Sequence, residues 1–174
     1  MITETTEQQK EYFGNLLSAF EGQYLLTLEL KRSTSDVDEF KLLQQFVISL
    51  NNSVFMNRRP NKEHSLKGFV VTEKPRSSPT VLYHLLIAEA DYSLPPLARL
   101  RRMTQKAVTD SQRRLRSEGI VGFTLRDYAD HKNSHFGRYV SRKFQFKSMR
   151  WNRSKEAVGL LSPKGVLFGR DRFA

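Results

Sequence analysis

The chain contains no cysteine, which excludes disulfide bridges, thiolate metal sites and a cysteine nucleophile. No apolar run reaches the roughly 18 residues that a membrane-spanning helix needs. The first ten residues are polar and acidic, unlike the basic start and apolar core of a secretory signal. We therefore expect a cytoplasmic protein with no membrane partner, although the lack of cysteine itself leaves the compartment unspecified.

Acidic residues are scarce after the first quarter of the chain. The whole sequence has 29 Lys and Arg against 18 Asp and Glu, a net charge of +11. Residues 1–40 hold eight acids and three bases, a net charge of −5, so residues 41–174 carry +16. The stretch 132–155 contains eight bases and no acid. This imbalance predicts a polyanionic partner and points to the second part of the chain as its binding surface.

The length of 174 residues and the hydrophobic content of 39% are typical of one folded domain. Apolar residues at three- and four-residue intervals predict an amphipathic helix over residues 5–20, which Gly22 would end. We expect residues 1–22 to belong to the same domain as residues 23–174, because no long linker separates them.

Periodicity predicts an alternation of strands and helices along the rest of the chain. A second helix would begin at Asp36, with Glu39 three residues later as its capping partner. A helix over 97–116 would end at Gly119, with Leu100, Met103, Val108 and Leu115 on its apolar face. The order of elements predicts an α+β fold with an antiparallel central sheet, a ferredoxin-like or RRM-like palm, and helices packed mainly on one face. The remaining expected elements are strands at 23–30, 66–73, 80–87, 120–125 and 165–168 and a helix at 134–146.

Three short segments carry a resemblance to a known family. They are Leu25–Leu30 (LLTLEL), Tyr83–Ile87 (YHLLI) and Phe136–Lys143 (FGRYVSRK), in this order. They resemble the three motifs of the His-hydrophobic-His (HUH) endonucleases, the rolling-circle replication initiators and relaxases that nick single-stranded DNA. The resemblance spans residues 24–146 and is closest to the initiators of plasmids and filamentous phages.

The resemblance implies a metal-dependent endonuclease and strand transferase acting on single-stranded or hairpin origin DNA. Tyr139 would attack the phosphate and form a covalent phosphotyrosine. Arg142 or Lys143, three and four residues further along the helix, would stabilise the developing negative charge. Assembly of several copies on the DNA is left open.

The same resemblance implies a Mg²⁺ or Mn²⁺ ion held by histidine. His84 matches one of the family's two histidines, but Leu82 stands in the place of the other. Because these cations also accept carboxylates, Glu73 and Glu29 are candidate replacements, with His64 as a further one.

The DNA-binding candidates are the bases on the helix over 97–116 and those around Tyr139. We expect them to contact phosphates. They are Arg99, Arg101, Arg102, Arg113, Arg114 and Arg116 on the helix, and Lys132, Arg138, Lys147, Arg150 and Arg153 in the acid-free stretch.

Two other readings of the sequence remain open. The helix over 97–116 and the strand over 120–125 also resemble the recognition helix and wing of a winged-helix domain, which predicts a non-catalytic, sequence-specific regulator of double-stranded DNA. RNA binding on an exposed sheet is the least favoured, because Phe69, Tyr83 and Phe123 do not form the known short stacking motif.

Overall fold

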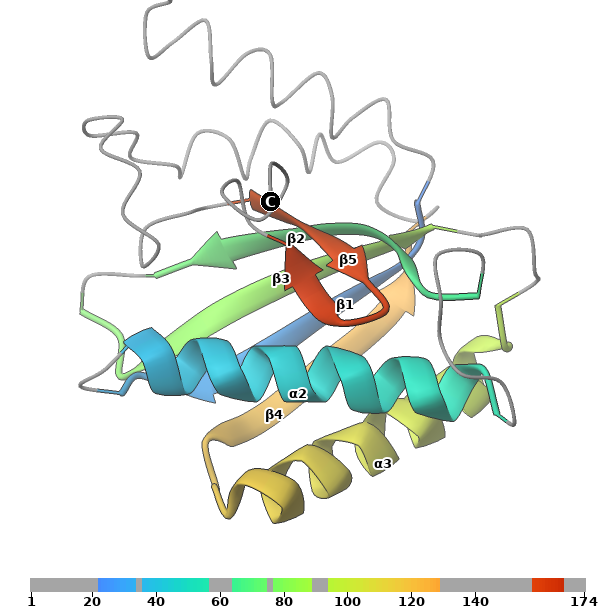
Figure 1. Ribbon diagram of the computed structural model, residues 1–174. Helices are drawn as coiled ribbons and strands as arrows, with labels where there is room; N and C mark the ends of the chain where they lie inside the picture. The colour runs from blue at the N-terminus through green and yellow to red at the C-terminus, as the bar shows by residue number, and fades with distance from the viewer. Residues whose placement is uncertain are drawn as a thin grey trace, which may run out of the picture.

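A computed structural model describes residues 22–33, 36–56, 64–74, 77–88, 94–128 and 158–167 of the chain. The helices predicted over residues 5–20 and 134–146 lie outside these ranges. Neither described helix has the length and apolar character needed to cross a membrane. The elements, shown in Figure 1, are β1 (Gly22–Lys31), α2 (Asp36–Val54), β2 (Lys67–Glu73), β3 (Thr80–Ala88), α3 (Leu97–Leu115), β4 (Ile120–Asp127), β5 (Val158–Ser162) and β6 (Gly165–Leu167).

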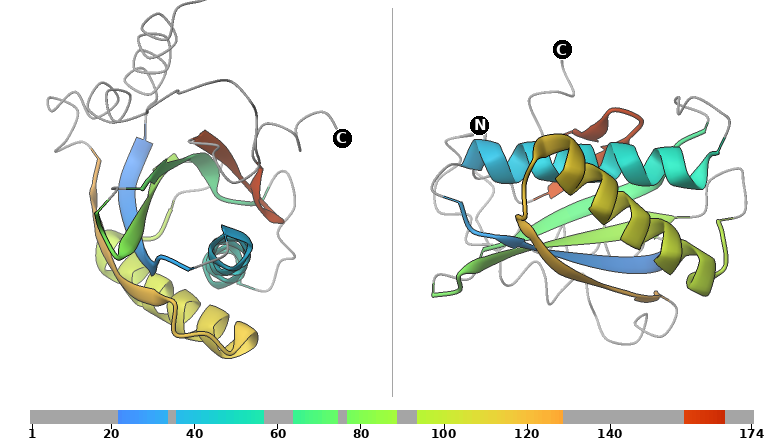
Figure 2. Two further views of the ribbon diagram at one scale, coloured as in Figure 1. Left: turned by 90° about the vertical axis from the view of Figure 1, so that its left-hand side faces the viewer. Right: turned by 90° about the horizontal axis from the view of Figure 1, so that it is seen from below.

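The described strands form one sheet in the order β4-β1-β3-β2-β5-β6. Every neighbouring pair is antiparallel. The first four strands and the two helices follow the β-α-β-β-α-β order of ferredoxin-like folds. Both helices lie on the same side of the sheet, and the sheet curves around α2 (Figure 2). The predicted α+β fold, with an antiparallel central sheet and helices on one face, is confirmed.

The core lies between the sheet and the helices because alternate strand residues point to one side. Leu26, Leu28 and Leu30 of β1 are fully buried there. They share one cluster with Leu43 and Phe46 of α2. Each such side chain contributes about 1.5–3 kcal/mol through its removal from water, so this layer holds α2 against the sheet.

Small residues mediate the packing of α3, a feature that the sequence pattern did not predict. Thr104, Ala107 and Ser111 are fully buried, whereas Leu115, predicted for the apolar face, is 39% exposed. The hydroxyl of Thr104 donates to the Leu100 carbonyl at 2.8 Å, and that of Ser111 donates to the Ala107 carbonyl at 2.6 Å. These bonds let a polar residue enter the interior without an unsatisfied hydroxyl.

α2 begins at Asp36 as predicted, but the end of α3 and the hydrogen bond of Glu39 differ from prediction. α3 ends at Leu115, where Arg116 takes a left-handed conformation with φ of 49° and the Ser117 amide donates to the Gln112 carbonyl. Gly119, the predicted end, instead packs closely against Leu42, whose Cδ2 would lie 2.7 Å from an added Cβ. Near the start of α2, the Glu39 carboxylate accepts a hydrogen bond from the Ser33 amide at 2.8 Å. Ser33 precedes Asp36, the predicted capping residue.

The β5–β6 hairpin extends the sheet and is fastened to α2 by two amide side chains. Gln44 both donates to and accepts from the backbone of Val166, each at 2.6 Å. Asn51, fully buried, donates to the Ser162 carbonyl and accepts from the Leu66 amide. The sequence predicted a strand at 165–168 but missed β5, which pairs with β2.

Candidate functional site

The face of the sheet that points away from α2 and α3, called the distal face below, carries His84. Residues opposite each other in an antiparallel pair share a face. His84 of β3 lies opposite Thr27 of β1, and Thr27 lies opposite Thr124 of β4. These three residues form a polar row across three adjacent strands. The predicted metal ligand therefore lies on β3 in the middle of the sheet, on the face opposite the two described helices α2 and α3.

Both ring nitrogens of His84 have a partner. Nδ1 lies 2.9 Å from the hydroxyl oxygen of Thr27, and Nε2 lies 3.0 Å from Glu73 Oε2. His84 is only 9% exposed. A ring held from both sides has one orientation, as in a metal site or a proton-transfer site where a second group fixes the imidazole.

The predicted carboxylate ligands occupy the next row of the distal face. Glu29 and Glu73 both lie opposite Leu82, on either side of it. Two strand spacings put their backbones about 10 Å apart. Glu73 contacts His84, whereas β3, with Leu82, lies between Glu29 and Glu73. No group of three potential ligands forms among the residues that the structure describes.

Tyr128 is a distal-face residue that the sequence analysis overlooked. It is 3% exposed and packs with Leu25 and Leu86, the neighbours of Thr27 and His84 along their strands. Burial raises the pKa of its hydroxyl above the ordinary value. The phenolate form is therefore disfavoured, and we interpret Tyr128 as a packing residue. The feature of the sequence that could have identified Tyr128 is its position just after the strand predicted at 120–125.

The fold differs from what the RNA-binding and winged-helix predictions require. Tyr83 is buried in the core and Phe123 packs against the same cluster, so they face the helices and form no exposed stacking array with Phe69. The strand predicted as a wing is β4, which pairs with β1 along its length. The segment 97–125 is therefore part of the central sheet domain and not a recognition helix with a separate wing.

The arginines of α3 lie on the other side of the sheet from His84. Arg99, Arg101, Arg102, Arg113 and Arg114 of α3, and Arg116 just after its end, are all exposed, and their contacts with phosphates stay a prediction. Arg101 donates to the Leu125 carbonyl of β4 at 3.1 Å, so it also covers part of the sheet edge. His84 therefore lies on the distal face, and the helix that carries these arginines packs against the other face (α3 in Figure 1).

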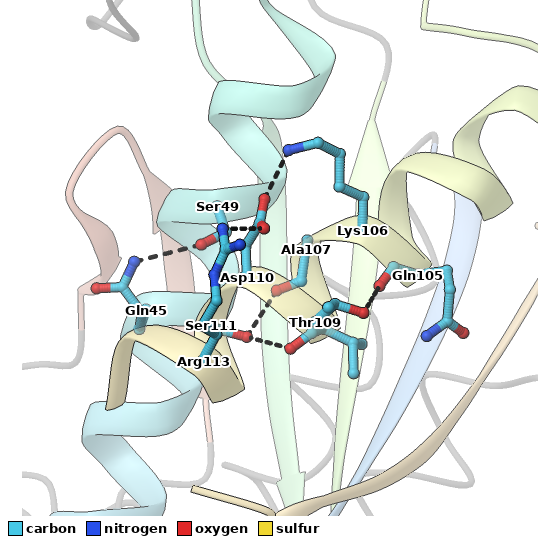
Figure 3. A network of polar contacts seen from close by, with 10 residues as sticks. Gln45, Ser49, Gln105, Lys106, Ala107, Thr109, Asp110, Ser111 and Arg113 are labelled. Atoms are coloured by element: carbon cyan, nitrogen blue, oxygen red, sulfur yellow. Dashed lines mark hydrogen bonds and ion pairs between the residues drawn. The ribbon is translucent and has the colours of Figure 1, made fainter. Parts of the chain in front are cut away.

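Asp110 is the single acid among these bases. Its carboxylate binds Lys106 Nζ at 2.6 Å and Arg113 Nη2 at 3.0 Å (Figure 3). The hydrogen bond from Lys106, with the positive charges of Lys106 and Arg113, holds the pKa of Asp110 below its ordinary value. Asp110 therefore stays ionised at neutral pH and orders the two cations beside it.

Replacing Asp110 with asparagine should lower the free energy of unfolding by about 0.5 kcal/mol at neutral pH, because two exposed ion pairs are lost. A lowered carboxyl pKa contributes stability above the ordinary pKa, and this contribution disappears as the pH falls through the lowered value. Urea unfolding of both proteins at about pH 7 and about pH 2 measures the change. A difference of equal size at both pH values would contradict the ion-pair assignment.

Among the described residues, one predicted pair of ligands is in contact, His84 and Glu73. Glu29 lies on the other side of Leu82 from Glu73. The catalytic candidates Tyr139, Arg142 and Lys143 and the DNA-binding candidates Lys132, Arg138, Lys147, Arg150 and Arg153 lie outside the described residues. The further candidate His64 lies within them and is half-buried, ahead of β2. Comparisons of the chain with models of protein families, with curated proteins and with solved structures found no match.

Proposed function

We propose that the protein nicks DNA in the manner of a replication initiator or relaxase, binding single-stranded or hairpin DNA and cutting and rejoining it through Tyr139. The observation that carries this proposal is the fixed His84 ring, held between Thr27 and Glu73 on the distal face. An imidazole paired with a carboxylate can hold a cation or transfer a proton beside a phosphodiester. The net charge of +11 favours a polyanionic substrate.

A divalent cation would assist at this position. A phosphodiester repels nucleophiles through its negative charge, and bound Mg²⁺ or Mn²⁺ withdraws that charge. His84 Nε2 and Glu73 would each contribute a ligand if the cation replaced the hydrogen bond that now joins them. The described residues fall short of a complete ligand set, so Glu29 would have to move toward the pair or a further ligand would come from elsewhere in the chain.

The nucleophilic step would be carried by the phenolic oxygen of Tyr139. It loses its proton and forms a new bond to phosphorus, while the bond from phosphorus to one strand end breaks. That strand end gains a proton and leaves as a hydroxyl, and the other end stays bound as a phosphotyrosine. Arg142 or Lys143 would stabilise the charge on the reacting oxygens. The covalent bond conserves the energy needed to rejoin the strands.

Labelled hairpin DNA incubated with the protein and Mn²⁺ should give an adduct that resists denaturation. Tyr139→Phe should abolish the adduct, because phenylalanine has no nucleophilic oxygen. Tyr128→Phe is the matched control, since Tyr128 belongs to a packing cluster. The adduct is measured on a denaturing gel.

Two outcomes would contradict the proposal. One is an adduct that survives Tyr139→Phe, which would assign the chemistry to another group. The other is the lack of any adduct with a pool of hairpin and single-stranded origin sequences, while the same preparation binds them.

The second candidate function is DNA binding without cleavage. The observation that favours it is Leu82, an apolar side chain between the two carboxylates Glu29 and Glu73. Binding that needs no metal and yields no adduct would support this candidate, and a Mn²⁺-dependent adduct would remove it.

A further inference from the structure

Four cations of α3 follow one line along the helix. Arg99, Arg102, Lys106 and Arg113 are exposed and recur at intervals of three, four and seven residues, which keeps them on one side of a helix. The row extends over about 21 Å, because each helical residue adds about 1.5 Å. We call these four residues the α3 basic row.

The row is only partly neutralised. Asp110 pairs with Lys106 and Arg113. Arg99 and Arg102 form no ion pair with the residues that the structure describes. Like charges three or four residues apart destabilise a helix by about 0.2–0.5 kcal/mol per pair. A bound anion would relieve this repulsion, so the row has the properties of a binding surface.

The row is separate from the site of the proposed function. The residues of α3 that face the sheet, such as Leu100 and Ala107, belong to the core. The row is on the outer side of the helix, and His84 is on the opposite face of the sheet. A ligand on the row is therefore a second ligand, or a second part of one nucleic acid that reaches around the domain.

The composition of α3 indicates which kind of nucleic acid fits the α3 basic row. Proteins that hold single strands combine positive charge with aromatic side chains on which the bases stack. α3 contains no Phe, Tyr or Trp, and the exposed uncharged side chains beside the row are Ala98, Gln105 and Thr109. In a duplex the bases are stacked inside and the phosphates are outside. A straight row of cations without aromatics fits the phosphate backbone of a duplex.

We infer that the α3 basic row binds the phosphate backbone of double-stranded DNA, independently of sequence and of the distal face. The row would hold the duplex beside the strand on which the protein acts. This inference does not require that the protein cuts DNA, since the row and the His84 pair lie on different faces.

Arg99→Gln/Arg102→Gln tests the inference, with binding of a short labelled duplex of arbitrary sequence measured by fluorescence anisotropy across a range of salt. Each lost phosphate contact reduces the slope of log K against log salt by about 0.9, so the double variant should lose roughly 2. Affinity for the duplex at 0.1 M salt should fall on the order of 10- to 60-fold. Affinity for a single strand of the same length should change far less.

Lys41→Gln/Lys164→Gln is the matched control, because it removes the same charge at exposed positions outside the row. This control should keep the wild-type slope. The inference is overturned if the row variant, with a wild-type melting curve, keeps the wild-type slope. It is also overturned if both double variants lose affinity equally, or if the row variant loses duplex and single-strand binding to the same extent.

Discussion

Replacing Leu82 with histidine should give the protein a site for Mn²⁺ that binds at least about tenfold more tightly than wild type, a gain of about 1.4 kcal/mol. Leu82 lies opposite Glu29 on one side and opposite Glu73 on the other. Side chains directly opposite in an antiparallel pair have Cβ atoms about 4.5–5.5 Å apart. A ring at this position would therefore reach both carboxylates.

The new ring would also share a face with His84, two residues along β3. Four potential ligands would then surround one point: two imidazoles and two carboxylates, a mixture that Mn²⁺ accepts. Leu82 is only half-buried, so the polar ring should be tolerated. Isothermal titration calorimetry with Mn²⁺ measures the change.

Two control proteins make this result specific. Leu82→His/His84→Ala should lose the gain, because one imidazole is removed again. Val121→His adds a histidine at an exposed position of β4 and should bind Mn²⁺ like wild type. If Leu82→His folds normally and binds no more tightly than Val121→His, the arrangement of Glu29, Leu82 and Glu73 is wrong.

Replacing Gly68 with alanine should remove a large part of the stability, about 4 kcal/mol or more. Gly68 has φ of +146°, which side-chain-bearing residues rarely adopt, and an added Cβ would lie 1.9 Å from the Leu86 carbonyl oxygen. That carbonyl is part of β3, so the clash cannot be relieved by a side-chain rotation. The pairing of β2 with β3, and with it the contact between Glu73 and His84, should be weakened.

Gly122→Ala provides a matched control. A Cβ at Gly122 would meet nothing within 4 Å, so this variant should unfold close to the wild-type midpoint. For a chain of this size, 4 kcal/mol corresponds to a loss of roughly 8–16 °C in melting temperature. Thermal unfolding followed by circular dichroism measures both variants. A Gly68→Ala midpoint within about 2 °C of wild type would contradict the close approach of β2 to β3.

Periodicity was sufficient to predict most of the fold. The apolar alternation at the end of β1 and the three-to-four spacing in α2 come from local sequence, and burial follows these periods. β3 is instead an apolar run that is buried on both faces from Tyr83 to Ile87. β5 was missed because a five-residue segment has too few positions to reveal a period. The end of α3 was placed at Gly119 from residue type, whereas Arg116 takes the left-handed position.

The candidate site was less predictable because its contacts depend on how strands pair. His84, Glu73 and Glu29 were each identifiable by residue type. Glu29 and Glu73 have the same register, since both lie opposite Leu82. The orientation of the His84 ring decides which carboxylate it contacts, because Nδ1 lies near Thr27 and Nε2 lies near Glu73. The sequence identified the α3 arginines and His84 without showing on which face of the sheet each lies. The sheet separates them, because both helices pack on the face opposite His84.

The central claim is that Tyr139 becomes covalently bound to a cut DNA strand, and peptide mapping tests it most directly. The adduct formed with Mn²⁺ would be trimmed by nuclease, digested after lysine and analysed by mass spectrometry. Cleavage at Lys132 and Lys143 gives a peptide of residues 133–143 with Tyr139 as its one tyrosine, separate from the peptide 107–132 that holds Tyr128. We expect the residual nucleotide on the peptide 133–143. A nucleotide on another peptide, or on none, would contradict the claim.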